Sequence, residues 1–200
     1  MDWTGIKIKT APAVEPVTVQ EMREYLSLGG TEDDTLLTGL ITAARSALEK
    51  STGRTFITTT YQLYYDGFFL SSIKLARPPV QSVSSITYVD DDGVTQTLSS
   101  TLYTVDISSL YGRVSPAYGE SWPVTRAQDN AVCIEFKAGY GDAAANVPEP
   151  LKIAIKMLAA DVYEHREANV EVALSKNRSL DFLLAGYTIP GVACRPSPEG

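Results

Sequence analysis

Hydrophobic residues recur at helical spacing near the start of the chain and predict a first helix over residues 18–28. Thr18 and Glu21, three positions apart, are typical of a capping box. Val17 and Met22 can form the hydrophobic staple that accompanies such a cap. The stripe expected to be buried consists of Val19, Met22 and Leu26.

A second helix is predicted over residues 32–52, with Thr31 at its start. The Asp34 side chain is placed to bond back to Thr31, as in a capping box. Gly53 is the glycine expected just beyond its C-terminus. The core-facing residues would be Leu36, Leu37, Leu40, Ile41, Ala44 and Leu48.

Beyond Gly53 the composition changes to threonine, tyrosine, valine and isoleucine with many turn residues, which predicts a β region over residues 56–141. The expected strands are 56–65, 82–89, 94–98, 102–105 and 131–138. In the last of these, apolar and polar residues alternate from Val132 to Lys137, as in a half-buried strand, and Asp92-Gly93 marks a hairpin turn. The sheet should therefore be mainly antiparallel.

A third helix is predicted over residues 150–167, after Pro148 and Pro150. Its apolar stripe would be Leu151, Ile155, Leu158 and Val162. The sequence thus predicts an α+β fold in which a small helical bundle, two N-terminal helices plus this late one, carries an inserted, mainly antiparallel β region. This domain would span residues 17–167.

Both ends lack such a pattern, so we expect extended arms over residues 1–16 and 168–200 that a partner orders, with one short helix at 179–185 in the second. The formal net charge of −7 and the pI of about 4.8 disfavour gripping of nucleic acid by the overall surface, but they allow a channel through which DNA slides. No apolar run is long enough to cross a membrane, and we expect synthesis in a cytoplasm.

Candidate chemistry is sparse, and we expect no catalytic residue, no metal site and no cofactor. Asp90-Asp91-Asp92-Gly93 lacks the alternating ligands of a calcium loop and fits a hairpin turn better. Gly139-Tyr140-Gly141 opens a G-x-G-x-x-A pattern, but prolines delay the following helix and leave a phosphate without aligned amides. His165 is the only histidine, and Cys133 and Cys194 are too isolated for a framework of disulfides or a zinc site.

The aromatic segment Tyr118-Gly119-Glu120-Ser121-Trp122-Pro123 offers one further candidate. Tryptophan and tyrosine can stack on a sugar or a nucleic-acid base, yet few basic residues lie nearby. The alternative, which we favour, is a loop packed on its own domain or on a neighbouring subunit.

Several segments, taken in order, resemble the phage head-tail connector family, in particular its subgroup of phage head-tail adaptor proteins. They are residues 32–37 leading to Thr52-Gly53-Arg54, residues 77–83 with 86–90, residues 118–123 followed by 139–141, and a helix after Val147-Pro148. Together they span roughly residues 17–167, and their order is more specific than any one of them.

The resemblance implies a non-enzymatic, structural ring in the virion neck, a dodecamer below the portal protein, through which genomic DNA passes without specific binding. It further implies that the C-terminal segment contacts the portal and that loops at the opposite end contact the next neck or tail component, a stopper or tail terminator. On this sequence the candidate portal-contact residues are Phe182, Leu183, Leu184, Tyr187 and Ile189. The candidates for the inter-subunit or tail-side loop are Tyr118, Glu120, Trp122 and Arg126.

Two alternatives stay open at the level of sequence. The same helices and sheet also suit a tail-side joining protein or a head-completion protein. A hydrolase or sugar-binding enzyme could use acidic pairs with the Trp122 loop, although the spacing singles out no such pair.

Overall fold

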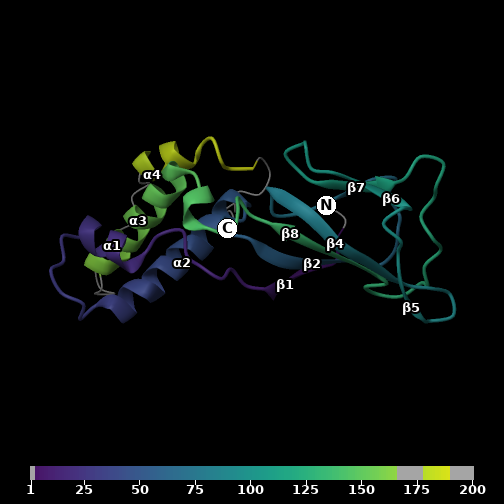
Figure 1. The fold of residues 1–200 in the computed structure, drawn as a ribbon, viewed down its shortest axis with the longest axis horizontal. Helices are drawn as coiled ribbons and strands as arrows, with labels where there is room; N and C mark the ends of the chain where they lie inside the picture. Colours follow the sequence, from purple (N-terminus) through teal and green to yellow (C-terminus); the bar gives the residue numbers. More distant parts are fainter. Residues whose placement is uncertain (1–2, 166–177, 190–200) are drawn as a thin grey trace, which may run out of the picture. The chain divides into compact units, whose positions relative to one another are not determined.

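The computed structural model describes residues 3–165 and 178–189, which form an α+β fold (Figure 1). The chain divides into two compact units. We call residues 1–12 with 58–140 the sheet unit, and residues 13–57 with 141–200 the helical unit. No helix in the described ranges is long and apolar enough to cross a membrane.

The sheet unit contains two antiparallel sheets around one core. The five-stranded sheet has the order β1 (Gly5–Thr10), β2 (Thr59–Tyr65), β8 (Val132–Ala138), β4 (Val80–Val89) and β5 (Thr95–Thr97). The three-stranded sheet has the order β3 (Ile73–Lys74), β7 (Arg113–Pro116) and β6 (Tyr103–Asp106). Alternate residues of the central strands, such as Leu63, Ile134 and Phe136, are fully buried in the core that both sheets share.

All five predicted strands exist, with ends shifted by up to three residues, and the predicted antiparallel arrangement is confirmed. Three strands, β1, β3 and β7, were not predicted. The expectation that a partner orders the N-terminal arm is wrong for residues 5–10, because β1 pairs with β2 of the same chain from Gly5 to Thr10.

The helical unit contains α1 (Val19–Tyr25), α2 (Asp34–Thr52), α3 (Glu149–Glu164) and α4 (Arg178–Leu184), with a short 3-10 turn at Ala144–Asn146. Helices α1 and α3 both contact α2, and α4 contacts α3. The buried residues recur at helical spacing as the pattern predicted, and they include Leu37, Ile41, Leu48, Leu151 and Ile155.

The capping box of the first helix is confirmed, because the Thr18 hydroxyl accepts from the Glu21 amide and the Glu21 carboxylate accepts from the Thr18 amide. The predicted start of the second helix is wrong: α2 begins at Asp34, with Asp33 as N-cap. Instead of capping that helix, the Asp34 carboxylate lies 3.4 Å from the Arg23 guanidinium of α1. Two predicted core residues, Leu36 and Val162, are exposed, because they stand off the contacting faces of their helices.

Candidate assembly interfaces

The predicted aromatic loop is held by its tryptophan. Trp122 stacks on Phe68, with ring centroids 4.6 Å apart and planes 6° apart, and its Nε1–H donates to the Leu70 carbonyl at 2.8 Å. Phe68 also meets Tyr88 edge-on. Of the two locations that the sequence left open, the structure therefore places Trp122 against its own unit.

Other side chains of the loop are more exposed than Trp122. Tyr118 is fully exposed, at 106% of its reference area, and Glu120 is exposed beside it. Gly119 between them has a φ of 82°, a left-handed conformation that suits glycine at the tip of a turn. Arg126 has an exposed side chain, and its amide donates to the Val89 carbonyl at 3.0 Å. The loop thus presents Tyr118 and Glu120, while Trp122 anchors it.

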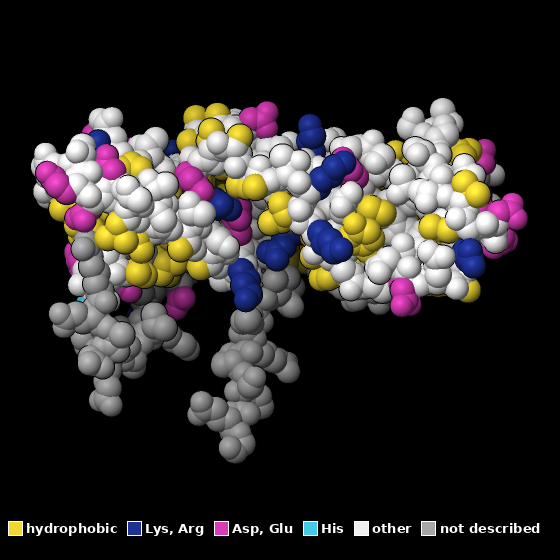
Figure 2. Space-filling view, turned by 90° about the horizontal axis from the view of Figure 1, so that it is seen from below, with side chains coloured by type: hydrophobic (Ala, Val, Ile, Leu, Met, Phe, Trp, Pro, Cys, Tyr) yellow, Lys and Arg dark blue, Asp and Glu magenta, His cyan; other side chains and the backbone are white. Residues whose placement is uncertain are grey.

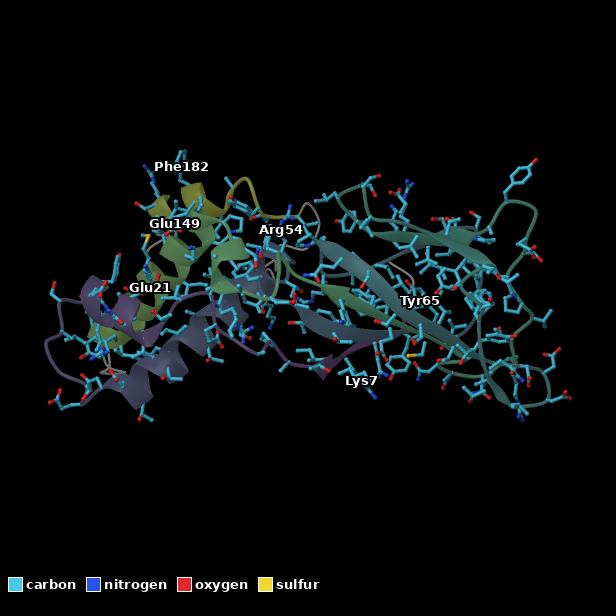
Figure 3. The ribbon with its side chains drawn as sticks, in the orientation of Figure 1. Lys7, Glu21, Arg54, Tyr65, Glu149 and Phe182 are labelled. Atoms are coloured by element: carbon cyan, nitrogen blue, oxygen red, sulfur yellow. The ribbon has the colours of Figure 1, made fainter. Side chains whose placement is uncertain are left out.

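The five C-terminal candidates also divide into anchors and exposed residues. Leu184 and Ile189 are buried, and the Ile189 amide donates to the Thr52 carbonyl at 3.0 Å. Arg54 donates from Nε to the Tyr187 carbonyl at 2.5 Å, which ties the same segment to the end of α2. Phe182 is 84% exposed and points outward from α4 (Figure 3), and Leu183 is half-buried.

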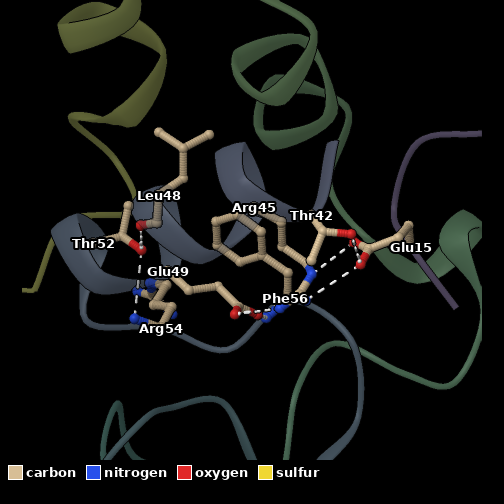
Figure 4. A network of polar contacts seen from close by, with 8 residues as sticks. All are labelled: Glu15, Thr42, Arg45, Leu48, Glu49, Thr52, Arg54 and Phe56. Carbon is tan, nitrogen blue, oxygen red and sulfur yellow. Dashed lines mark hydrogen bonds and ion pairs between the residues drawn. The ribbon is translucent and has the colours of Figure 1, made fainter. Parts of the chain in front are cut away.

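A polar network that the sequence analysis missed fixes the start of the helical unit to α2 (Figure 4). Arg45 is buried, and its guanidinium donates to Glu15 at 2.7 Å and to Glu49 at 2.8 Å. Glu49 in turn accepts from the Phe56 amide at 2.7 Å. A charged residue at core spacing, next to Ala44 in the buried stripe, was the signal in the sequence.

The electrostatics of the capping box follow from its hydrogen bonds. The Thr18 amide donates to the Glu21 carboxylate at 2.7 Å, and this bond lowers the pKa of Glu21 below its usual value. A similar effect is larger at Asp106, which accepts from Ser108 and Arg113, so that its pKa falls to about 2. Both carboxylates stabilise turns or helix ends.

The motifs considered for chemistry lie at turns or at the ends of strands and helices. Asp90 of the hairpin accepts from the Gln96 side chain at 2.8 Å and from the Val94 amide at 2.9 Å, and these hydrogen bonds lower the pKa of its carboxyl. The Gly139 amide donates to the Pro79 carbonyl at 2.8 Å, and α3 begins ten residues after Gly139, at Glu149. His165 follows the last turn of α3, where its Nδ1 lies 2.9 Å from the Asp161 carbonyl.

Cys133 is a free, half-buried thiol on β8, and burial raises the pKa of this thiol. Cys194 lies outside the described residues. In the described ranges, no group of three or more histidine, cysteine, aspartate or glutamate side chains is arranged to hold a metal ion.

The sheet unit has a cavity of about 370 Å³ with a mostly apolar lining. The residues that line it are Trp3, Tyr65, Leu70, Ser72, Lys74, Leu75, Ala76 and Tyr111. Glycoside cleavage needs two carboxylates facing one another, and this lining contains neither aspartate nor glutamate.

Solved structures share this fold across almost the whole chain. A chain in the neck of an empty gene transfer agent (GTA) particle, computed with C6 symmetry, is 24% identical with a TM-score of 0.77, over 98% of this chain and 99% of that one. A chain in the virion of a native gene transfer agent particle is also 24% identical, with a TM-score of 0.77 over 97% and 98%. A chain in the neck of a native GTA particle, computed with C12 symmetry, is 22% identical, with a TM-score of 0.72 over 96% and 98%.

The comparison with curated proteins found no match. A family model described as "Head completion protein" matches residues 15–174, which include most of both units. The resemblance to head-tail connector proteins is thereby confirmed at the level of the family, and with it a structural role in joining head and tail. The chain belongs to the head completion protein family.

Proposed function

We propose that this chain forms a ring in the neck of a tailed particle, below the portal, where it joins head to tail and surrounds the path of the DNA. The observation that carries the proposal is the family match over residues 15–174. The related necks were computed with C6 and C12 symmetry, which supports a dodecamer as the closed assembly. Such a ring needs two different contact surfaces on each copy.

On the portal side, we assign the contact to the exposed part of the segment around α4. Phe182 carries it, because an aromatic ring that is 84% exposed gains most from burial against a partner. Leu184 and Ile189 are already buried in the helical unit, so their part is to hold the segment in place. Leu183 is half-buried, and the Tyr187 carbonyl is bonded to Arg54. We therefore assign these two residues, too, to holding the segment in place.

On the side of the next neck or tail component, or of the neighbouring copy, we assign the contact to Tyr118 and Glu120. Both side chains are exposed at the tip of a loop that Trp122 holds rigid. A rigid loop with an exposed tyrosine loses little conformational entropy when a partner covers it. We also assign Arg126 to this contact, because the residue is exposed and its guanidinium lies beside Gly93 at the hairpin turn.

A structural, non-enzymatic role also agrees with the chemistry of the molecule. The cavity of about 370 Å³ in the sheet unit is mostly apolar and lined without carboxylates, and the sequence predicts no cofactor. The acidic balance of −7 suits a channel that does not retain phosphate backbones. Genomic DNA would therefore pass through the ring without specific binding.

The description of the matching family supports a second placement, as a head-completion protein that seals the filled head directly. Both placements need contact with the portal or with a protein bound to it. They differ in which proteins lie above and below the ring, and electron cryo-microscopy of particles separates them.

The first test is the mass of the purified protein alone and mixed with its portal, measured by light scattering after size exclusion. We expect a stoichiometric complex with the portal, and we expect Phe182→Ala to weaken it by about tenfold or more, as for a central aromatic contact. Ser179→Ala, an exposed change on the same helix, is the matched control and should bind normally. A wild-type chain that forms no complex with the portal would contradict the proposal.

A further inference from the structure

The outer face of the five-stranded sheet is a polar surface that points away from the core. Cross-strand pairs place Lys7, Gln62, Glu135 and Ser85 in one row across β1, β2, β8 and β4. Residues directly opposite one another share a face of the sheet. In the described residues, the core of the sheet unit lies on the other face, where Leu63, Ile86 and Ile134 are fully buried.

This outer face is basic in an acidic protein. Lys7, Lys9 and Lys137 stand on it with exposed side chains, and Glu135 is the carboxylate among them. Lys9 pairs with Glu135 at 2.6 Å, and Lys7 lies over the Tyr64 ring, 5.4 Å from its centroid. In the view from below, lysine and arginine side chains stand among uncharged, hydrophobic and a few acidic ones (Figure 2). Two lysines thus remain in excess of the acidic charge on this face.

The helical unit carries the opposite charge. It holds 15 of the 24 acidic residues of the chain but 10 of the 17 basic ones. Exposed carboxylates on its described helices include Glu24, Asp161 and Glu164. Identical chains with a net charge of −7 repel one another, so a ring forms most readily when the basic face of one copy meets an acidic surface of the next.

We propose that the outer face of the five-stranded sheet docks on the helical unit of the neighbouring copy, and this inference rests on the proposed ring. The contact joins two different surfaces, as closure by rotation requires. The binding partner of this face is a second copy rather than DNA, because an excess of two lysines on each copy binds phosphates only weakly. Charge complementarity between this basic face and the acidic helical unit, in contrast, sets which side of each copy meets the next.

The test combines charge reversal with a thiol reporter that the face already contains. Lys7→Glu with Lys137→Glu reverses the two lysines that are not bonded to Glu135. Lys74→Glu with Arg113→Glu is the matched control, since both residues are exposed on the three-stranded sheet and the change in net charge is the same. Cys133 lies on the outer face opposite Tyr64 and Thr87, and Cys194→Ser leaves it as the single thiol.

Ring formation on the portal is measured by sedimentation velocity, and alkylation of Cys133 is followed by mass spectrometry before and after assembly without DNA. We expect the Lys7/Lys137 variant to need about tenfold more protein for half-assembly, and the control to stay within about twofold. Alkylation of Cys133 should slow by about tenfold in the wild-type ring, because a neighbour covers the face. Circular dichroism confirms that each variant is folded.

An unchanged rate of alkylation in an intact ring, or equal assembly of both variants, would overturn this contact and leave the ring itself standing. Protection of Cys133 only after duplex DNA is added would assign the face to the channel instead, and it would also overturn the contact. A wild-type chain that forms no ring on its portal would remove both this inference and the proposed function.

Discussion

Neighbouring residues in one loop have opposite physical roles. Tyr118 is fully exposed, whereas Trp122, four positions later, is stacked on Phe68 and bonded to Leu70. Sequence alone gives both the same aromatic character, so their roles depend on which ring finds a partner within the unit. The tryptophan therefore determines stability, and the tyrosine is available for binding.

Replacing Trp122 with leucine should lower the free energy of unfolding by about 2–3 kcal/mol, because the ring stack and the bond to the Leu70 carbonyl are both lost. Tyr118→Leu should change it by less than about 0.5 kcal/mol, since the side chain is exposed. Urea denaturation followed by circular dichroism measures both. If both variants changed the free energy of unfolding equally, the ring stack would contribute nothing to stability.

Asp106 should titrate far below an ordinary aspartate. Its folded pKa of about 2 lies below the ordinary aspartate value of 3.8, so the carboxylate stabilises its turn fully above about pH 4 and loses this effect as the pH falls through 2. Carbon-13 chemical shifts of the carboxyl group report this midpoint. Ser108→Ala removes the hydrogen bond that lowers the pKa most, and it should move the midpoint upward. A wild-type midpoint near 4 would contradict this environment.

At the scale of elements, the two N-terminal helices differ in how they begin. Helix α1 begins with a reciprocal capping box at Thr18 and Glu21, whereas the N-cap Asp33 of α2 makes no side-chain capping bond. The two helices had similar start signals in the sequence. Only the first pattern is realised, because Asp34 lies beside Arg23 instead of bonding back to residue 31.

Thr18→Ala should therefore cost about 1 kcal/mol of stability, the usual loss for an N-cap side chain. Thr31→Ala should cost much less, because Thr31 lies outside the helix and its backbone, not its side chain, bonds to Asp34. Thermal unfolding of the two variants decides this. A larger effect at residue 31 than at residue 18 would show that the caps are assigned incorrectly.

The long elements could be predicted from their periods and the short strands β5 and β6 from the turn residues around them, but strands β1, β3 and β7 could not be predicted. Helix α2 and strand β8 show clear periods over many residues, and their bounds were predicted to within two positions. Strands β3 and β7 have two and four residues, too few for any period. Strand β1 alternates Ile6 and Ile8 with Lys7 and Lys9, but the prolines that follow it suggested an unpaired arm.

The candidate site residues were harder to predict because exposure depends on tertiary contacts. Nothing local to the sequence separates Phe182, which is 84% exposed, from Leu184, which is buried against the helical unit. Ile189 is buried because its segment returns to the end of α2. Arg45 could have been recognised, since a charged residue in a buried stripe requires acidic partners.

At the scale of the whole molecule, two units of different fold contribute to one structural role. The family match includes parts of both units, so neither is an accessory to the other. Contacts with the portal, with the next component and with neighbouring copies are assigned to α4, to the loop of Tyr118 and to the outer face of the five-stranded sheet. A ring subunit needs separate surfaces of this kind.

The most direct test of the central claim is electron cryo-microscopy of particles that contain this protein, with the neck reconstructed locally. We expect a closed ring of this fold between the portal and the tail, with α4 toward the portal. Absence of the fold from the neck, or its presence only elsewhere in the particle, would contradict the claim.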